Sequence, residues 1–178
     1  KRHNSVPNLN EIDLNDSQVL ANFAAGKTIG VFQFESAGMR KLLTELGADG
    51  TLVFDDLVAV TALYRPGPLD SGMTDSYVLR KRGKEAVDYV VPQMQAALGK
   101  TYGVAVYQEQ IMQLARDLAG FSFSEADSLR KAMSKKDAKV MAAMEDRWVR
   151  GCIQHSKMDG PLAQELFDSV SNFASYAF

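Results

Sequence analysis

The sequence predicts a mainly α-helical protein with at most one or two short strands. Apolar residues recur at spacings of three and four along most of the chain, which is the period of an amphipathic helix. Glycine, proline and small polar residues separate these segments, as they do where helices begin and end. With 46% apolar and 24% charged residues, the composition is that of a globular protein and excludes wholesale disorder.

The N-terminal part is predicted to contain two helices and the best candidate for a strand. Residues 1–15 are polar and irregular, which is typical of a tail or linker. Asp16 is the expected N-cap of a helix over residues 17–25. Its apolar side would consist of Val19, Leu20 and Phe23. Residues 28–34 form a short apolar run rich in strand formers.

The next two helices have clear end signals. Ser36 is predicted to open a helix that closes at Gly47, with an apolar stripe at positions i, i+3, i+4 and i+7. That stripe is Met39, Leu42, Leu43 and Leu46. A largely buried helix follows over residues 54–63. The sequence RPGP at residues 65–68 is expected to end it in a stiff, non-helical turn, because proline fixes φ and restricts the preceding residue.

The C-terminal two-thirds is predicted to be mainly helical, with a turn or short strand over residues 102–107. Expected helices cover residues 73–82, 91–98, 108–118, the segment after 124, 137–155, and the segment from Pro161. Ser124 and Asp127 have the spacing of a capping box with aspartate in the acidic position. The longer helix over 137–155 would bury one side, consisting of Met141, Met144, Trp148 and Cys152. In the last helix the inward residues would be Leu162, Leu166, Val170 and Phe173.

Composition excludes several classes of protein. A single cysteine, Cys152, cannot form an internal disulfide, and a reduced thiol is expected. No apolar run approaches the roughly 18 residues of a membrane span, so no membrane partner is predicted. No nucleophile elbow, Walker loop or dinucleotide fingerprint is present. Asp55 and Asp56 are adjacent and would point about 100° apart on a helix, which favours helix-start carboxylates over a metal site.

Positive charge is concentrated in two segments. The net charge is −2, yet residues 80–84 carry four positive charges and no acid, and residues 130–150 carry seven positive charges against three acids. The remainder of the chain therefore sums to −10. Such a distribution indicates localised anion binding rather than a protein that coats DNA. The alternative is that both clusters are solvated helix faces.

The segment LRKAMSKK at residues 129–136 is the strongest candidate for chemistry. Leu129 and Met133 would face the core at i and i+4, which leaves the cations on the flanking faces. These cations are Arg130, Lys131, Lys135 and Lys136. A guanidinium offers a planar fork for phosphate oxygens and an ammonium offers a point charge, so this array suits a triphosphate. A merely solvated face remains the alternative.

Five segments together resemble the alpha subunit of bacterial DNA polymerase III, the C-family replicative polymerases. In chain order they are GVFQFESAGM (30–39), ALYRPGPL (62–69), YG followed by YQEQIMQ (102–113), LRKAMSKK (129–136) and FASYAF (173–178). The resemblance implies a tail or linker over 1–15, a palm-to-fingers junction over 16–69 and a helical fingers region over 70–178. It further implies a fragment of a cytoplasmic DNA-directed DNA polymerase.

The resemblance also implies roles for particular residues. The family's Arg-Arg pair lies by the triphosphate of the incoming dNTP, and it corresponds to Arg130 and Lys131. Lys135 and Lys136 would add to the positive electrostatic field at that triphosphate. Arg65 is a further candidate for phosphate contact, although bracing of the turn is the favoured role. Lys131 stands where the family has its second arginine. Gln108 is expected to hold its loop rather than touch substrate.

What the resemblance leaves out bears on activity. The family's catalytic aspartates lie in the palm, and no segment here matches them, so no catalytic residue and no Mg²⁺ ligand is expected in this chain. The parent would polymerise DNA with Mg²⁺, dNTP and primer-template, whereas this chain alone would be inactive. Contacts with the sliding clamp and other replisome subunits would belong to regions not represented here. The alternative is a non-catalytic helical binding module derived from a polymerase, such as one carried by a phage.

Overall fold

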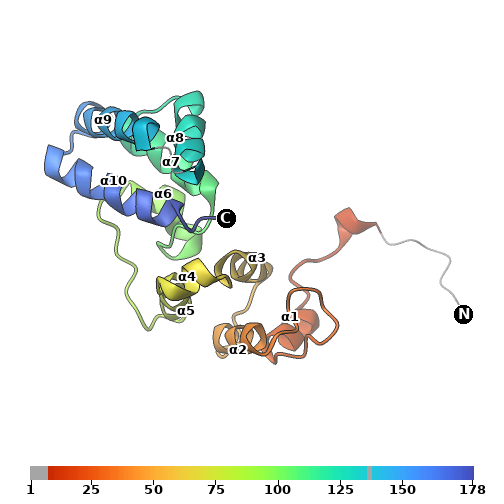
Figure 1. Cartoon of the computed structure of the whole chain (residues 1–178). Helices are drawn as coiled ribbons and strands as arrows, with labels where there is room; N and C mark the ends of the chain where they lie inside the picture. The colour runs from red at the N-terminus through yellow and green to blue at the C-terminus, as the bar shows by residue number, and fades with distance from the viewer. Residues whose placement is uncertain (1–7, 136–137) are drawn as a thin grey trace, which may run out of the picture. The chain divides into compact units, whose positions relative to one another are not determined.

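The computed structural model describes residues 8–135 and 138–178, and in these residues it is helical without a strand (Figure 1). Ten α-helices and two short 3₁₀-helices make up the described structure. The prediction of a mainly α protein is confirmed. Every helix in this part of the chain falls short of the length or the apolar content that a membrane span requires.

The chain divides into two compact units, one reaching to Thr61 and the other comprising Ala62–Phe178. The dividing point lies within helix α3 (Phe54–Leu63). The border at 69/70 expected from the resemblance is a functional border, and it stays a prediction.

The first unit contains η1 (Leu9–Glu11), α1 (Ser17–Ala24) and α2 (Ala37–Leu46), and it begins both α-helices at the predicted caps. The Asp16 carboxylate accepts hydrogen bonds from two N–H groups of the first turn of α1, and Ser36 accepts one from Met39 at 3.2 Å. The four predicted stripe residues of α2 are all buried. Val19 was expected on the apolar side of α1 but is 51% exposed. It lies about 100° around the helix from Leu20, the residue that α1 does bury.

The expected strand at residues 28–34 is wrong. This segment forms consecutive turns, in which the N–H of Val31 donates to the Thr28 carbonyl and the N–H of Phe34 donates to the Val31 carbonyl. Gly30 and Gln33 have positive φ values of 84° and 68°, which a strand does not allow. A strand needs a partner strand to pair with, and no strand occurs in the described residues. The apolar run forms turns whose hydrogen bonds join its own residues.

The second unit holds the remaining helices. They are α4 (Pro66–Asp70), α5 (Met73–Lys81), α6 (Met94–Leu98), η2 (Gly99–Thr101), α7 (Gln108–Ala119), α8 (Phe123–Lys135), α9 (Ala138–His155) and α10 (Gly160–Ala174). The RPGP turn ends α3 as predicted, but its expected non-helical form is wrong. Arg65 is extended (φ −141°, ψ 155°), as the residue before proline should be, and Pro66 then opens the short helix α4. Proline suits a first helical turn, where its missing N–H is not needed.

Helices α7, α8, α9 and α10 pack around one apolar core, as Figure 1 shows for the group coloured green to blue. Trp148 and Cys152 of α9 are fully buried, as predicted, and Met141 and Met144 are partly buried against the same core. The Trp148 indole N–H donates to the Ala163 carbonyl of α10 at 3.1 Å. Burial raises the pKa of the Cys152 thiol to about 11, which keeps it protonated at neutral pH.

Candidate anion-binding site

The first turn of α8 sets the direction in which its later side chains point. The Ser122 hydroxyl accepts a hydrogen bond from the Glu125 N–H at 3.2 Å, and the Ser122 N–H donates to the Glu125 carboxylate at 2.7 Å. The capping box predicted at Ser124 and Asp127 is therefore wrong by two residues. Hydrogen bonds from Ser122 and from Arg147 lower the pKa of Glu125 to about 2. Asp127, relieved of a capping role, lies in the second turn.

Arg147 belongs to the basic segment 130–150. It connects α9 to the end of α7 and the start of α8. Its Nε donates to Glu125 at 2.9 Å, and its two terminal nitrogens donate to the carbonyls of Ala119 and Gly120 at 3.2 Å. The guanidinium also lies over the Phe121 ring, 4.7 Å from its centroid. Arg147 thus supplies hydrogen bonds to carbonyls that the end of α7 leaves without an intrahelical partner.

Two further basic residues outside α8 pair with nearby acids. Arg150 pairs with Asp146 one turn earlier on α9. In the segment 80–84, the Arg80 Nε lies 2.6 Å from a Glu85 oxygen. In these two pairs a nearby acid compensates the positive charge.

Arg130 is held by acceptors from two helices. Its Nε and Nη2 donate to the same Asp127 oxygen at 3.0 and 2.8 Å, and its Nη1 donates to the Gln108 side-chain oxygen at 3.1 Å. The Arg130 side chain is 30% exposed. Gln108, expected to hold its own loop, contacts the guanidinium of the next helix. The loop is held by Gln110, whose side-chain oxygen accepts from the N–H groups of Val106 and Tyr107 at 2.8 and 2.9 Å.

Lys131 shares the same carboxylate. Its Nζ lies 2.6 Å from the second Asp127 oxygen, and its side chain is 60% exposed. Hydrogen bonds from Lys131 and then Arg130 hold the pKa of the Asp127 carboxyl below its usual value. The structure therefore brings the two predicted phosphate ligands together at one carboxylate that sequence reasoning had assigned to a helix cap.

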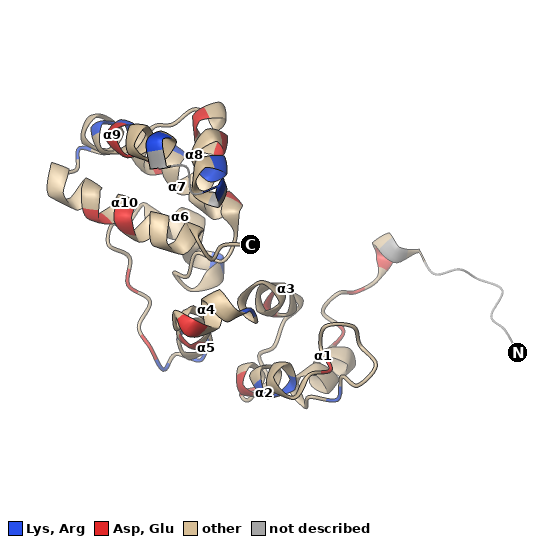
Figure 2. Cartoon of the chain, in the orientation of Figure 1, with Lys and Arg blue, Asp and Glu red and all other residues tan. Residues whose placement is uncertain are grey.

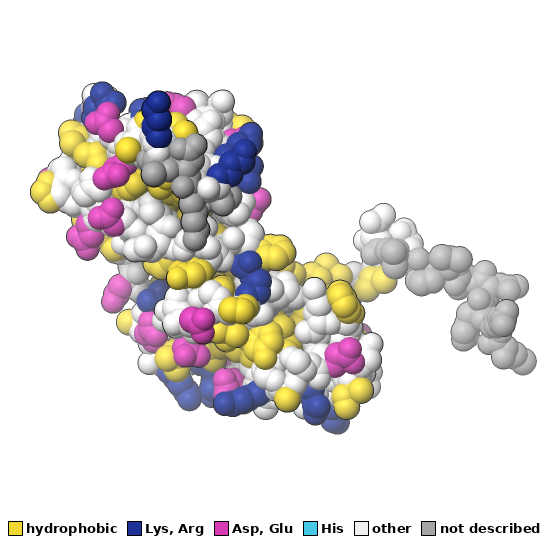
Figure 3. All heavy atoms as spheres, viewed as in Figure 1, with side chains coloured by type: hydrophobic (Ala, Val, Ile, Leu, Met, Phe, Trp, Pro, Cys, Tyr) yellow, Lys and Arg dark blue, Asp and Glu magenta, His cyan; other side chains and the backbone are white. Residues whose placement is uncertain are grey.

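The remaining predicted lysines lie at the end of α8. Lys135 is exposed in its last turn, and Lys136 lies outside the described residues. Figure 2 shows Lys and Arg positions in the second half of α8, and Figure 3 shows such side chains at the surface over that helix. Arg130, Lys131 and Lys135 with Asp127 leave a net charge of +2 here.

Arg65 lies elsewhere in the second unit and contacts protein carbonyls. Its Nε donates to Ala62 at 2.7 Å and its Nη2 donates to Tyr176 at 2.6 Å. Its guanidinium lies 5.1 Å from the centroid of the Phe178 ring. These contacts support the bracing role favoured from the sequence, and the phosphate contact of Arg65 stays a prediction.

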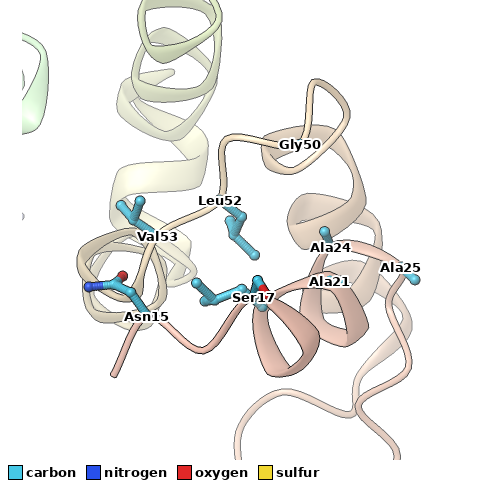
Figure 4. Close-up of a pocket in the computed structure, with 9 residues that line it drawn as sticks. Asn15, Ser17, Ala21, Ala24, Ala25, Gly50, Leu52 and Val53 are labelled. Atoms are coloured by element: carbon cyan, nitrogen blue, oxygen red, sulfur yellow. The ribbon is translucent and has the colours of Figure 1, made fainter. Parts of the chain in front are cut away.

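Cavities do not by themselves mark the site. The recess beside Arg130 is too narrow for a water molecule, so an anion would meet the guanidinium from the surface. Its lining is Gln108, Ile111, Arg130, Met133 and Ala174. A larger cavity of about 520 Å³ lies in the first unit between α1 and the segment 50–53 (Figure 4). No ionisable side chain lines that cavity, so it offers no charge to an anion.

Comparison with known families identifies the chain. The family described as "Bacterial DNA polymerase III alpha subunit finger domain" matches residues 1–156. This chain belongs to that finger-domain family. The matched residues cover the whole of α8, including Asp127, Arg130 and Lys131.

Whole polymerase subunits contain segments similar to this finger domain. DNA polymerase III subunit alpha of Aquifex aeolicus is 47% identical over 178 residues, which cover all of this chain and 15% of the relative. The subunits of Halalkalibacterium halodurans and Campylobacter jejuni are 43% and 40% identical over 96% and 100% of the chain. The chain spans 14% to 15% of the length of these relatives.

The described residues of this finger domain do not fit a catalytic metal. In residues 8–135 and 138–178, no three His, Cys, Asp or Glu side chains come together in a way that could hold an ion. Asp56, one of the adjacent acids noted in the sequence, is buried and accepts the Val53 N–H at 2.8 Å. Asp56 therefore acts at the start of α3.

Proposed function

We propose that this chain is part of the fingers of a DNA-directed DNA polymerase and that α8 contacts the triphosphate of the incoming dNTP. The observation that carries the proposal is the half-buried Arg130 guanidinium, held by Asp127 and Gln108 on a helix that also presents Lys131. Membership of the finger-domain family supports a nucleotide as the anion.

Hydrogen-bond geometry leaves room for phosphate on Arg130. A guanidinium has five N–H donors, and the three bonds to Asp127 and Gln108 use one from each nitrogen. The Nε and Nη2 bonds occupy one edge of the plane. One N–H group on Nη1 and one on Nη2 remain, and these two donors can bind phosphate oxygens.

The pairing with Asp127 does not prevent phosphate binding. Ion pairs exposed to this degree are weak, because water screens them. A hydrogen bond to a charged phosphate group contributes about 1.5–3 kcal/mol. A triphosphate can therefore bind beside the pair with a net gain. Lys131 would act as a point charge, whereas a second arginine would add another bidentate contact.

The activity proposed for the parent requires regions beyond this chain. Catalysis and Mg²⁺ binding belong to palm carboxylates that no segment here resembles, and primer-template DNA completes the site. Contacts with a sliding clamp and other replisome subunits likewise belong to other regions. We expect the parent to work in the cytoplasm and this chain alone not to extend a primer.

A chimeric polymerase tests the proposal. This chain replaces the 178-residue matched segment of the Aquifex aeolicus subunit, and primer extension is measured with Mg²⁺ and dNTPs. The chimera should extend primers and the isolated chain should not. A non-catalytic module would instead give a folded but inactive chimera.

Arg130→Ala in the chimera tests the site itself. Loss of a bidentate phosphate contact should lower kcat/KM for dNTP by about 10- to 100-fold. Arg150→Ala is the matched control, because Arg150 also pairs with an aspartate but lies on α9. Unchanged kcat and KM for Arg130→Ala would exclude the phosphate role.

A further inference from the structure

We infer that Asp127 is a positioning residue for dNTP binding, which fixes Arg130 and Lys131 in the orientation that receives the triphosphate. The inference rests on the proposed function. Each Asp127 oxygen serves a different cation: one accepts from Arg130 at 2.8 and 3.0 Å, and the other lies 2.6 Å from Lys131. Both cations follow Asp127 on the same helix, at i+3 and i+4.

Two acceptors determine the plane of the Arg130 guanidinium. Asp127 on α8 holds the edge formed by Nε and Nη2, and Gln108 at the start of α7 holds Nη1. A planar group tied at two points from two helices cannot rotate freely about its terminal bonds. Binding of a phosphate group then costs less conformational entropy, which is the usual benefit of preorganisation.

Asp127 has a different effect on Lys131. The lysine side chain is 60% exposed and long, so it would otherwise sample many rotamers. The ion pair to Asp127 keeps its ammonium beside Arg130. Both charges are therefore presented together, at the surface of one helix, before a ligand arrives.

Charge alone predicts the opposite effect of Asp127. A carboxylate repels phosphate, so its removal would tighten dNTP binding if charge dominated. Asp127 is, however, already neutralised by two cations, and the local net charge stays positive with it present. We therefore expect the loss of orientation to outweigh the relief of repulsion.

Two substitutions in the active chimera test the inference. Asp127→Ala removes both acceptors and should raise KM for dNTP about fivefold, with kcat changed less than about twofold. Asp127→Asn keeps one oxygen acceptor for Arg130 but loses the ion pair with Lys131, so its KM should rise less. In the Arg130→Ala background, Asp127→Ala should raise KM for dNTP by a smaller factor than it does alone. A purely structural role would not produce this dependence on Arg130.

Controls separate this inference from the proposed function. Asp146→Ala removes the matched carboxylate of the pair on α9 and should leave KM unchanged. Thermal unfolding establishes that each variant is folded, and the isosteric Asn variant serves if the Ala variant is not. If Asp127→Ala and Asp127→Asn leave KM unchanged or lower it while Arg130→Ala raises it, the positioning role is overturned and the phosphate site stands. If Arg130→Ala also has no effect, the proposed function fails.

Discussion

Glu125 shows how one residue serves two elements at once. Its carboxylate accepts from Ser122 to cap α8 and pairs with Arg147 of α9 at 2.9 Å. These hydrogen bonds favour the ionised form, which is why its pKa falls from 4.5 to about 2. Glu125 therefore links the beginning of α8 to the rest of the second unit.

The lowered pKa predicts how this link depends on pH. The contribution of Glu125 to stability is fully present above about pH 4.5 and is lost as the pH falls towards 2. In that range the unfolded chain binds a proton at Glu125 more readily than the folded chain does, which favours unfolding. Glu125→Gln keeps a capping side chain but cannot ionise. We expect it to lower the free energy of unfolding by less than about 1 kcal/mol at pH 7, since the pair is partly exposed.

Denaturant unfolding of the wild type and variant between pH 6 and 3 measures the effect. The difference between them should shrink as the pH falls. Glu125→Ala is the control: it should be less stable than Glu125→Gln at every pH, because it also removes the cap. A difference between wild type and Glu125→Gln that stays constant with pH would contradict the assignment.

At the scale of elements, the crossing of α7 and α9 depends on Gly151. A β-carbon at this position would lie 2.1 Å from the Ala119 carbonyl oxygen and 2.7 Å from Arg147 Nη1. The two helices can approach this closely only because residue 151 has no side chain. This contact also places Arg147 where it reaches the end of α7.

Gly151→Ala should therefore destabilise the fold although alanine favours helices. Helix propensity would add about 1 kcal/mol of stability, but overpacking against backbone should cost about 1–3 kcal/mol or more, and we expect a net loss. Gly99→Ala is the matched control, since Gly99 has helical φ and ψ of −60° and −39° and a β-carbon there would lie 3.8 Å from the Gln95 side chain. Thermal unfolding of both variants decides: a Gly151→Ala protein as stable as Gly99→Ala would refute the close crossing.

Helix positions were predictable because their end signals are local. Asp16, Ser36 and Gly120 cap their helices through neighbours within a few residues, so the sequence contains the necessary information. The cap of α8 was misplaced because Ser122 and Ser124 both precede an acid by three residues, and only the folded chain shows which pair is used. Residues 28–34 were mistaken for a strand because pairing with another strand is not a local property.

At the scale of the whole chain, the fold joins residues that local patterns could not bring together. Gln108 and Arg130 are 22 positions apart, and Arg65 and Tyr176 are 111 apart. Packing of α7 against α8 creates the first contact, and no spacing rule predicts it. The cations themselves were predictable from the resemblance and the helix period, whereas their shared carboxylate was not.

The most direct test of the central claim measures equilibrium binding of nucleotides to the chimera with a primer-template that cannot be extended. Dissociation constants are compared for dATP and deoxyadenosine, with and without Arg130→Ala. If Arg130 contacts the triphosphate, the substitution should weaken dATP binding about 10-fold or more and leave deoxyadenosine binding unchanged. An equal loss for both ligands, or no loss for dATP, would contradict the account.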